Sequence, residues 1–168
     1  MGIQSPFAME LSLHPFASSK RSYILEQPDG QVVLRLDLDK HQPIMRATFA
    51  YGNRQWQIAR RGFTTRYDLI CLDPTRTNTG WLMGQFQPKF GGSGRFELTG
   101  YTFNWHHPLF HAHWEWQDQV GAPMMTFDAD GKGYRVRTEP RWHQYQDLYL
   151  LAAMGGYQIV RPDFTTFS

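Results

Sequence analysis

The stretch LYLLAAMGGYQIV, residues 148–160, decides the fold, because it is apolar on nearly every side. A helix that is apolar all round is buried on all sides, either in lipid or inside a protein. Its 13 residues are too few for a membrane span, which takes about 20. We therefore predict a helix surrounded by the rest of the chain. Ala152-Ala153 and Gly155-Gly156 would let neighbouring side chains approach its axis closely.

The chain before this helix reads as a series of short strands closed by turns. In residues 31–38, Leu34 and Leu36 alternate with Arg35 and Asp37, which is the period of a half-buried strand. The other strands are predicted at residues 23–27, 44–51, 54–61, 67–72, 79–87, 95–99, 101–105, 110–116, 124–127 and 133–138. Pattern and helix together predict a closed antiparallel β-barrel of about 10 to 12 strands that encloses a hydrophobic C-terminal helix at about residues 141–160.

Length and composition favour a single domain. The 168 residues divide into an irregular leader at 1–19, the barrel domain at 20–161 and a tail at 162–168. The leader lacks the continuous apolar run of a signal peptide, and the single cysteine, Cys71, excludes an internal disulfide framework. A net charge of +2 gives no broad electrostatic case for nucleic acid. We expect a cytoplasmic protein with no transmembrane segment.

Many hairpins followed by a hydrophobic C-terminal helix resemble the tubby C-terminal-like superfamily, which includes tubby proteins, phospholipid scramblases and LURP-one-related proteins. The residues that carry the resemblance are SYILEQPDGQVVLRL, GRFELTGYTFNW, WEWQDQVGAPMMTF and LYLLAAMGGYQIV, within residues 20–160. The resemblance implies a barrel threaded by its terminal helix. In tubby proteins it also implies phosphoinositide binding through basic barrel residues, although that lysine-arginine site has no match in this sequence.

The window NWHHPLFHAHWEW, residues 104–116, holds four of the seven histidines. Pro108 predicts a turn at His106-His107-Pro108, because proline fits poorly inside a central strand. Beyond it, one strand face carries Phe110, Ala112, Trp114 and Trp116, and the other carries His111, His113, Glu115 and Gln117. We predict that the aromatic face lies in the core and that the histidine face meets water.

The same pattern leaves a metal-dependent enzyme open as an alternative. Imidazoles at His111 and His113 would lie side by side, and Glu115 or His143 could serve as a further ligand, as a zinc site needs at least three. No Gly-x-Ser-x-Gly elbow and no phosphate-binding glycine motif occurs. We therefore predict no catalytic residue and no cofactor.

Arginines are the remaining candidates for function. Arg60, Arg61 and Arg66 flank a Gly-Phe bend, and Arg135 and Arg137 share one strand face. Outward arginines can meet lipid phosphates or an acidic partner, but they can also be a solvated face with local carboxylates such as Asp68 and Glu139.

These observations predict a non-enzymatic binding module. It would use the outer barrel surface to bind anionic lipid headgroups, at the periphery of a membrane, or a protein partner. Besides the metal enzyme, the other alternative is a carrier for a lipophilic ligand, which requires that the helix lie outside an open barrel.

Overall fold

A computed structural model describes residues 9–16, 21–39, 46–62, 64–76, 79–108 and 111–161. They form a closed antiparallel barrel in which each strand pairs with the next along the chain and β1 pairs with β12. The strands are β1 (Met9–Pro15), β2 (Ser22–Glu26), β3 (Val32–Leu38), β4 (Arg46–Tyr51), β5 (Arg54–Arg60), β6 (Tyr67–Leu72), β7 (Gly80–Pro88), β8 (Gly94–Leu98), β9 (Tyr101–His106), β10 (His113–Gln117), β11 (Pro123–Asp130) and β12 (Gly133–Thr138). The predicted fold class is confirmed.

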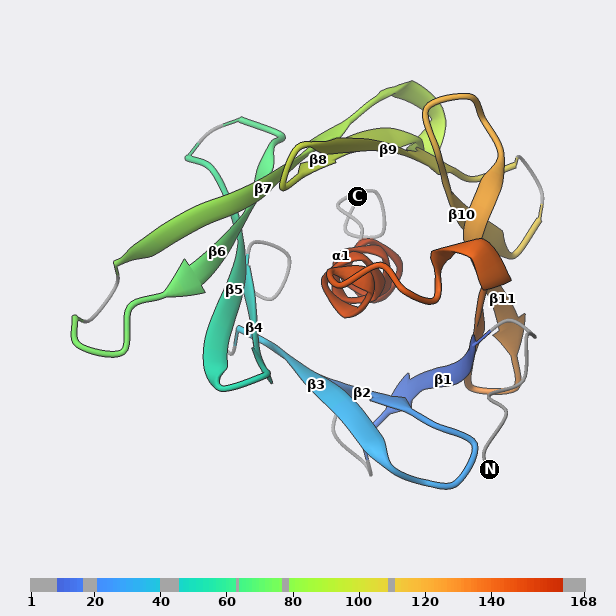
Figure 1. Ribbon diagram of the computed structural model, residues 1–168, viewed down its shortest axis with the longest axis horizontal. Helices are drawn as coiled ribbons and strands as arrows, with labels where there is room; N and C mark the ends of the chain where they lie inside the picture. Colours follow the sequence, from blue (N-terminus) through green and yellow to red (C-terminus); the bar gives the residue numbers. More distant parts are fainter. Residues whose placement is uncertain are drawn as a thin grey trace, which may run out of the picture.

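The helix α1 (Leu148–Val160) lies inside the barrel, where Figure 1 shows it end-on and ringed by strands. The indole of Trp116, on β10, donates a hydrogen bond to the Leu151 carbonyl at 3.0 Å. A methyl group added at Gly155 would lie 2.7 Å from the Trp116 Nε1 atom and 2.8 Å from the Phe127 ring. The small residues of α1 therefore do let strand side chains reach its axis, and the open interior that a lipophilic carrier requires is not present around α1.

The helix begins later than predicted. It starts at Leu148, whereas residues 141–147 form the end of the 3-10 helix η2 (Pro140–Trp142) and a series of turns. This segment carries Arg141, Gln144, Gln146 and Asp147, and polar side chains of that kind cannot enter an apolar barrel without large desolvation costs. The buried helix therefore begins only where the polar residues stop and the apolar run starts.

The prediction of an irregular leader over residues 1–19 is wrong for residues 9–15, which form β1. Leu11 and Leu13 are buried in the core, while Ser12 and His14, which alternate with them, are partly exposed. Without β1, the β2 and β12 strands would leave unpaired edges, and barrel closure removes such edges. Residues 1–8, 17–20 and the predicted tail at 162–168 lie outside the described residues.

No helix among the described residues is long and apolar enough to cross a membrane. Successive antiparallel strands alternate in direction, so β5, β7 and β9 all end at the same end of the barrel. The helix α1 also terminates at this end. Residues 61–66 and 89–93 connect strands at this end. We call it the helix-exit end, and the sites described below lie near it.

Candidate functional site

The histidine window divides differently from the prediction. His106 is the last residue of β9 rather than part of a turn, and β10 begins at His113. Trp116 is fully buried, whereas Trp114 is only partly buried and stacks on the His107 ring with centroids 4.4 Å apart. The prediction of a core face holds for Trp116 and is wrong for Ala112, which is exposed before the start of β10, and Phe110 lies outside the described residues.

His113 lies between two carboxylates instead of facing water alone. Its Nδ1 is 2.6 Å from Asp128 Oδ1, and its Nε2 is 3.1 Å from Glu115 Oε1. A carboxylate only accepts hydrogen bonds, so both contacts are satisfied when the ring is protonated. Burial opposes that charge, but the hydrogen bonds and negative charges of Asp128 and Glu115 outweigh it and raise the pKa of His113 above 6.5.

This arrangement does not assemble the predicted metal ligands. Both His113 nitrogens point to carboxylate oxygens, and His111 is an exposed residue outside the strand. The other suggested ligand, His143, has its Nε2 3.2 Å from the Thr138 carbonyl. Across the part of the chain that the structure describes, no group of three His, Cys, Asp or Glu side chains is placed to hold a metal ion.

Most of the predicted basic residues have local partners. Arg61 forms an ion pair with Asp68 at 3.1 Å, and the Nε of Arg60 donates to the Thr64 carbonyl at 2.7 Å. Arg135 forms ion pairs with Glu10 and Asp130 at 3.4 and 3.3 Å. Arg137 is exposed on the same face of β12, opposite Glu10 on β1. Arg61 and Arg135 therefore pair with local carboxylates and do not form an open cationic surface.

Arg66 lines a hollow together with two cations that the sequence did not single out. This cationic hollow, of about 270 Å³, lies on the outer face of the barrel at β7 and β8. Its lining residues are Arg66, Gln85, Gln87, Lys89, Arg95 and Glu97. The Arg66 Nε donates to Gln87 Oε1 at 3.4 Å. Within the described ranges, no carboxylate forms an ion pair with Arg66, Lys89 or Arg95.

The register of the strands explains why Arg95 has no such partner. Arg95 on β8 lies opposite Gln87 on β7 and Asn104 on β9, which are both uncharged. Glu97 is the one carboxylate of the hollow, so its lining carries three positive charges against one negative charge. The cationic hollow can therefore bind an anion through charge-assisted hydrogen bonds, which are roughly twice as strong as neutral ones.

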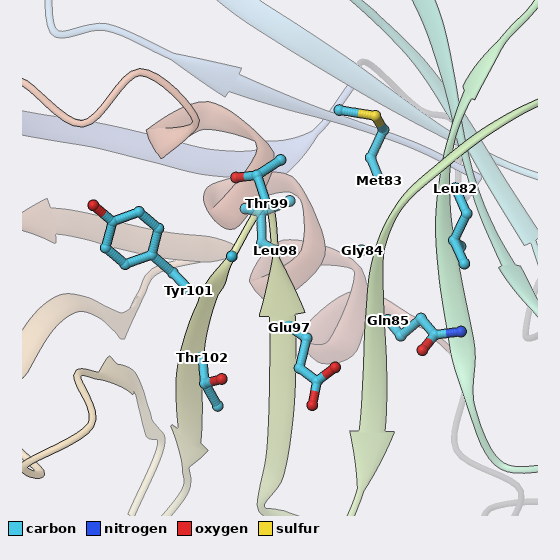
Figure 2. Close-up of a pocket in the computed structure, with 10 residues that line it drawn as sticks. Leu82, Met83, Gly84, Gln85, Glu97, Leu98, Thr99, Tyr101 and Thr102 are labelled. Carbon is cyan, nitrogen blue, oxygen red and sulfur yellow. The ribbon is translucent and has the colours of Figure 1, made fainter.

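A second hollow, of about 410 Å³, continues the first along β7 and β8, with Gln85 and Glu97 lining both. Figure 2 shows these two side chains next to one another on adjacent strands, with Thr102 beyond them on β9. The other end of the second hollow is lined by Leu82 and Tyr101, each 50% exposed. The outer face of β7 thus changes from cationic at the helix-exit end to apolar at the opposite end.

Phe90 lies directly beside the cationic hollow in sequence and is 100% exposed. It belongs to a short 3-10 turn, η1 (Phe90–Gly92), between Lys89 and Ser93. The Lys89 amide donates to the Ser93 carbonyl at 2.9 Å and closes the turn, which holds Phe90 out from the barrel end. A large aromatic side chain without contact to its own protein is available to an external apolar surface.

Sequence reasoning missed Lys89 and Arg95, which lie at the two ends of the segment KFGGSGR, residues 89–95. The signal was present: two cations bracket a glycine-rich hairpin whose tip is phenylalanine. Antiparallel pairing brings the two ends of such a hairpin together. Arg66 joins these two cations because β6 pairs with β7. It is 21 residues away from Gln87, the residue that it contacts, so the hairpin sequence alone does not predict its position.

Comparisons with known proteins define the class of this protein by fold alone. No protein-family model matches the sequence, and no curated protein matches it. An X-ray structure of a protein from Arabidopsis thaliana is similar, with a TM-score of 0.62 over 92% of this chain and 91% of that chain. The sequence identity is 8%, so this likeness shows a shared fold and carries no statement about activity.

Proposed function

We propose that this protein is a non-enzymatic binding module that docks on anionic membrane surfaces through the β7–β8 side of the helix-exit end. The observation that carries the proposal is the position of the fully exposed Phe90 beside three cations, Arg66, Lys89 and Arg95, that have no carboxylate ion pair among the described residues. Peripheral proteins combine the same two elements, apolar burial at the headgroup boundary and attraction to anionic lipids.

The binding free energies expected from these side chains support a membrane contact of moderate strength. Each Lys or Arg near an anionic leaflet contributes about 1 kcal/mol, so the three cations contribute roughly 3 kcal/mol. Partial insertion of one phenylalanine adds about 1 kcal/mol, since its complete burial is worth roughly 1.5–3 kcal/mol. Neither contribution anchors a protein alone, and the β7–β8 side of the helix-exit end combines both.

Membership of the tubby C-terminal-like superfamily is part of the same proposal. It is supported by the strand and helix pattern of the sequence and by the agreement between that pattern and a barrel threaded by α1. A cytoplasmic protein at the periphery of a membrane is the location that follows from the proposal. Headgroup phosphates are the ligand chemistry that fits the cationic hollow, since arginine and lysine both bind phosphate oxygens.

Vesicle co-sedimentation tests this function. The full-length protein is mixed with phosphatidylcholine vesicles, with vesicles that also contain phosphatidylserine, and with vesicles that also contain a phosphoinositide. The test variant is Arg66→Gln/Lys89→Gln/Arg95→Gln. The control variant, Arg135→Gln/Arg137→Gln/Arg141→Gln, removes the same charge from another side of the barrel.

We expect binding to both anionic vesicles and weak binding to phosphatidylcholine alone. The test variant should bind on the order of 100-fold more weakly, as roughly 3 kcal/mol predicts, and the control variant should bind almost as the wild type does. Equal losses in the two variants would mean that only net charge matters. Absence of binding to every vesicle would overturn the proposal and leave a protein partner as the remaining role of this surface.

A further inference from the structure

A separate pocket opens at the helix-exit end of the barrel, between the strands and the end of α1. We call it the mouth pocket. It has a volume of about 400 Å³, which lies within the usual range for small-molecule sites. Its lining includes Phe86, Lys89, Trp105, His107, Trp114 and Arg161. Only Lys89 is shared with the cationic hollow.

Aromatic rings form the walls of the mouth pocket. Phe86 and Trp105 are buried in the barrel core and reach its inner part. Trp114 and His107 stand as a nearly parallel stack, with an angle of 6° between their planes and 4.4 Å between their centroids. Flat faces of this kind bind flat rings, because offset-stacked and edge-to-face contacts are favoured beyond the area they bury.

His107 also has a defined hydrogen-bonding state. Its Nδ1 is 2.8 Å from the His113 carbonyl oxygen. A carbonyl only accepts, so Nδ1 carries the hydrogen and donates, and Nε2 is the acceptor in the neutral ring. The stack on Trp114 and this hydrogen bond together fix the orientation of the imidazole, so the wall is rigid before any ligand arrives.

Cations supply the polar part of the mouth pocket. Lys89 and Arg161 line it, and no Asp or Glu among the described residues does. The Arg161 guanidinium is held in place by two contacts, a hydrogen bond from its Nε to Gln158 Oε1 at 3.0 Å and a position 5.1 Å from the centre of the Tyr67 ring. A held guanidinium loses less freedom when it binds a carboxylate or phosphate than a mobile lysine does.

We propose that the mouth pocket is a binding site for a small aromatic anion, a flat ring system bearing a carboxylate or phosphate. The ring would lie against Trp114 and Trp105, and the anionic group would meet Arg161 and Lys89. This site is distinct from the membrane contact, because its aromatic walls and Arg161 take no part in the cationic hollow.

Isothermal titration calorimetry with 2-naphthoate tests the proposal on the full-length protein without lipid. We expect one binding site with a dissociation constant of about 1 mM or tighter, as the usual binding free energy per non-hydrogen atom of a small ligand allows. Two matched probes separate the contributions: 2-naphthamide keeps the rings without the charge, and cyclohexanecarboxylate keeps the charge without the aromatic face. Each should bind about tenfold more weakly than 2-naphthoate.

Variants locate the site. Arg161→Gln should weaken 2-naphthoate binding about tenfold, the usual effect of losing a hydrogen bond to a charged group. Ser93→Trp should abolish it, because Ser93 lines the pocket and its extended backbone, with φ −86° and ψ 179°, accepts any side chain. Arg95→Gln changes the cationic hollow but lies outside the mouth pocket, so it should leave 2-naphthoate binding unchanged.

Failure of 2-naphthoate to bind at millimolar concentration would overturn this inference and leave the membrane proposal untouched. Binding that persists in both Arg161→Gln and Ser93→Trp would also overturn it, because the probe would then occupy another part of the surface. If Arg161→Gln does not fold, Ser93→Trp still decides the location.

Discussion

Two sides of the barrel carry arginines in opposite circumstances. On the paired side, formed by β11, β12 and β1, Arg135 lies opposite Asp128 and forms ion pairs with Glu10 and Asp130. On the cationic side, formed by β7 and β8, Arg95 lies opposite Gln87 and Asn104. The residue type is the same and both side chains point outward, so the difference lies in the residues that the register places beside them.

This contrast separates arginines that stabilise the fold from arginines that can serve a ligand. An exposed ion pair contributes little, roughly 0.2–1 kcal/mol, but it occupies the charge. A cation without such a partner contributes still less to folding and keeps its charge for an anion from outside. The candidate site is therefore identified by what surrounds the cations rather than by their number.

Among single substitutions, the largest effect is expected from placing a carboxylate between two of the cations on the cationic side. Gln87→Glu is nearly isosteric and places a negative charge between Arg66, which already contacts this side chain, and Arg95 on the adjacent strand. Pairing two cations should remove roughly 2 kcal/mol of membrane attraction. Affinity for phosphatidylserine vesicles should then fall about 30-fold, with the melting temperature unchanged or slightly raised. Unchanged vesicle affinity would contradict the role of these cations.

A smaller effect is expected at Phe90, which tests the apolar part of the same contact. Phe90→Ala should weaken vesicle binding about fivefold, for a loss of roughly 1 kcal/mol of partial burial. Because Phe90 is 100% exposed, thermal unfolding without lipid should be the same as in the wild type. The exposed Val120, on another turn, supplies the control Val120→Ala, which should leave both measurements unchanged.

The paired side should respond in stability rather than in binding. Arg135→Gln removes ion pairs to Glu10 and Asp130, and we expect a loss of roughly 0.5–1 kcal/mol in the free energy of unfolding, measured by urea denaturation. Arg95→Gln is the matched substitution on the cationic side and should change it by less. The contrast between the sides would fail if Arg95→Gln were the more destabilising of the two.

The smallest effect concerns pH and His113, which lies on β10 next to the paired side and contacts Asp128 of β11. Its pKa is raised above 6.5 in the folded protein, so the protonated ring stabilises the fold. That contribution is fully present below the unfolded pKa and is lost as pH rises through the folded pKa. Unfolding free energy should therefore decline above pH 6.5 in the wild type and decline less in His113→Asn. Equal slopes in the two proteins would show that Asp128 and Glu115 do not hold the proton.

Much of the fold was predictable from local pattern. The alternation in residues 31–38 appears as β3, and the all-round apolarity of residues 148–160 appears as the enclosed α1. Both inferences follow from the sequence itself, since period-two alternation and complete apolarity each allow few environments. β1 was missed although Leu11 and Leu13 alternate with polar neighbours, because only closure with β12 makes so short a pattern necessary.

The candidate site, like the fold, was predictable from the sequence only in part. The sequence by itself determined the barrel, its threaded helix and the presence of outward arginines, because periodicity is a property of neighbouring residues. Only the tertiary structure decided which of those arginines are neutralised. Arg66, Lys89 and Arg95 converge, and His113 joins Asp128, through strand pairings between residues distant in the chain. The sequence lists the charges, and the register of the barrel decides which of them meet.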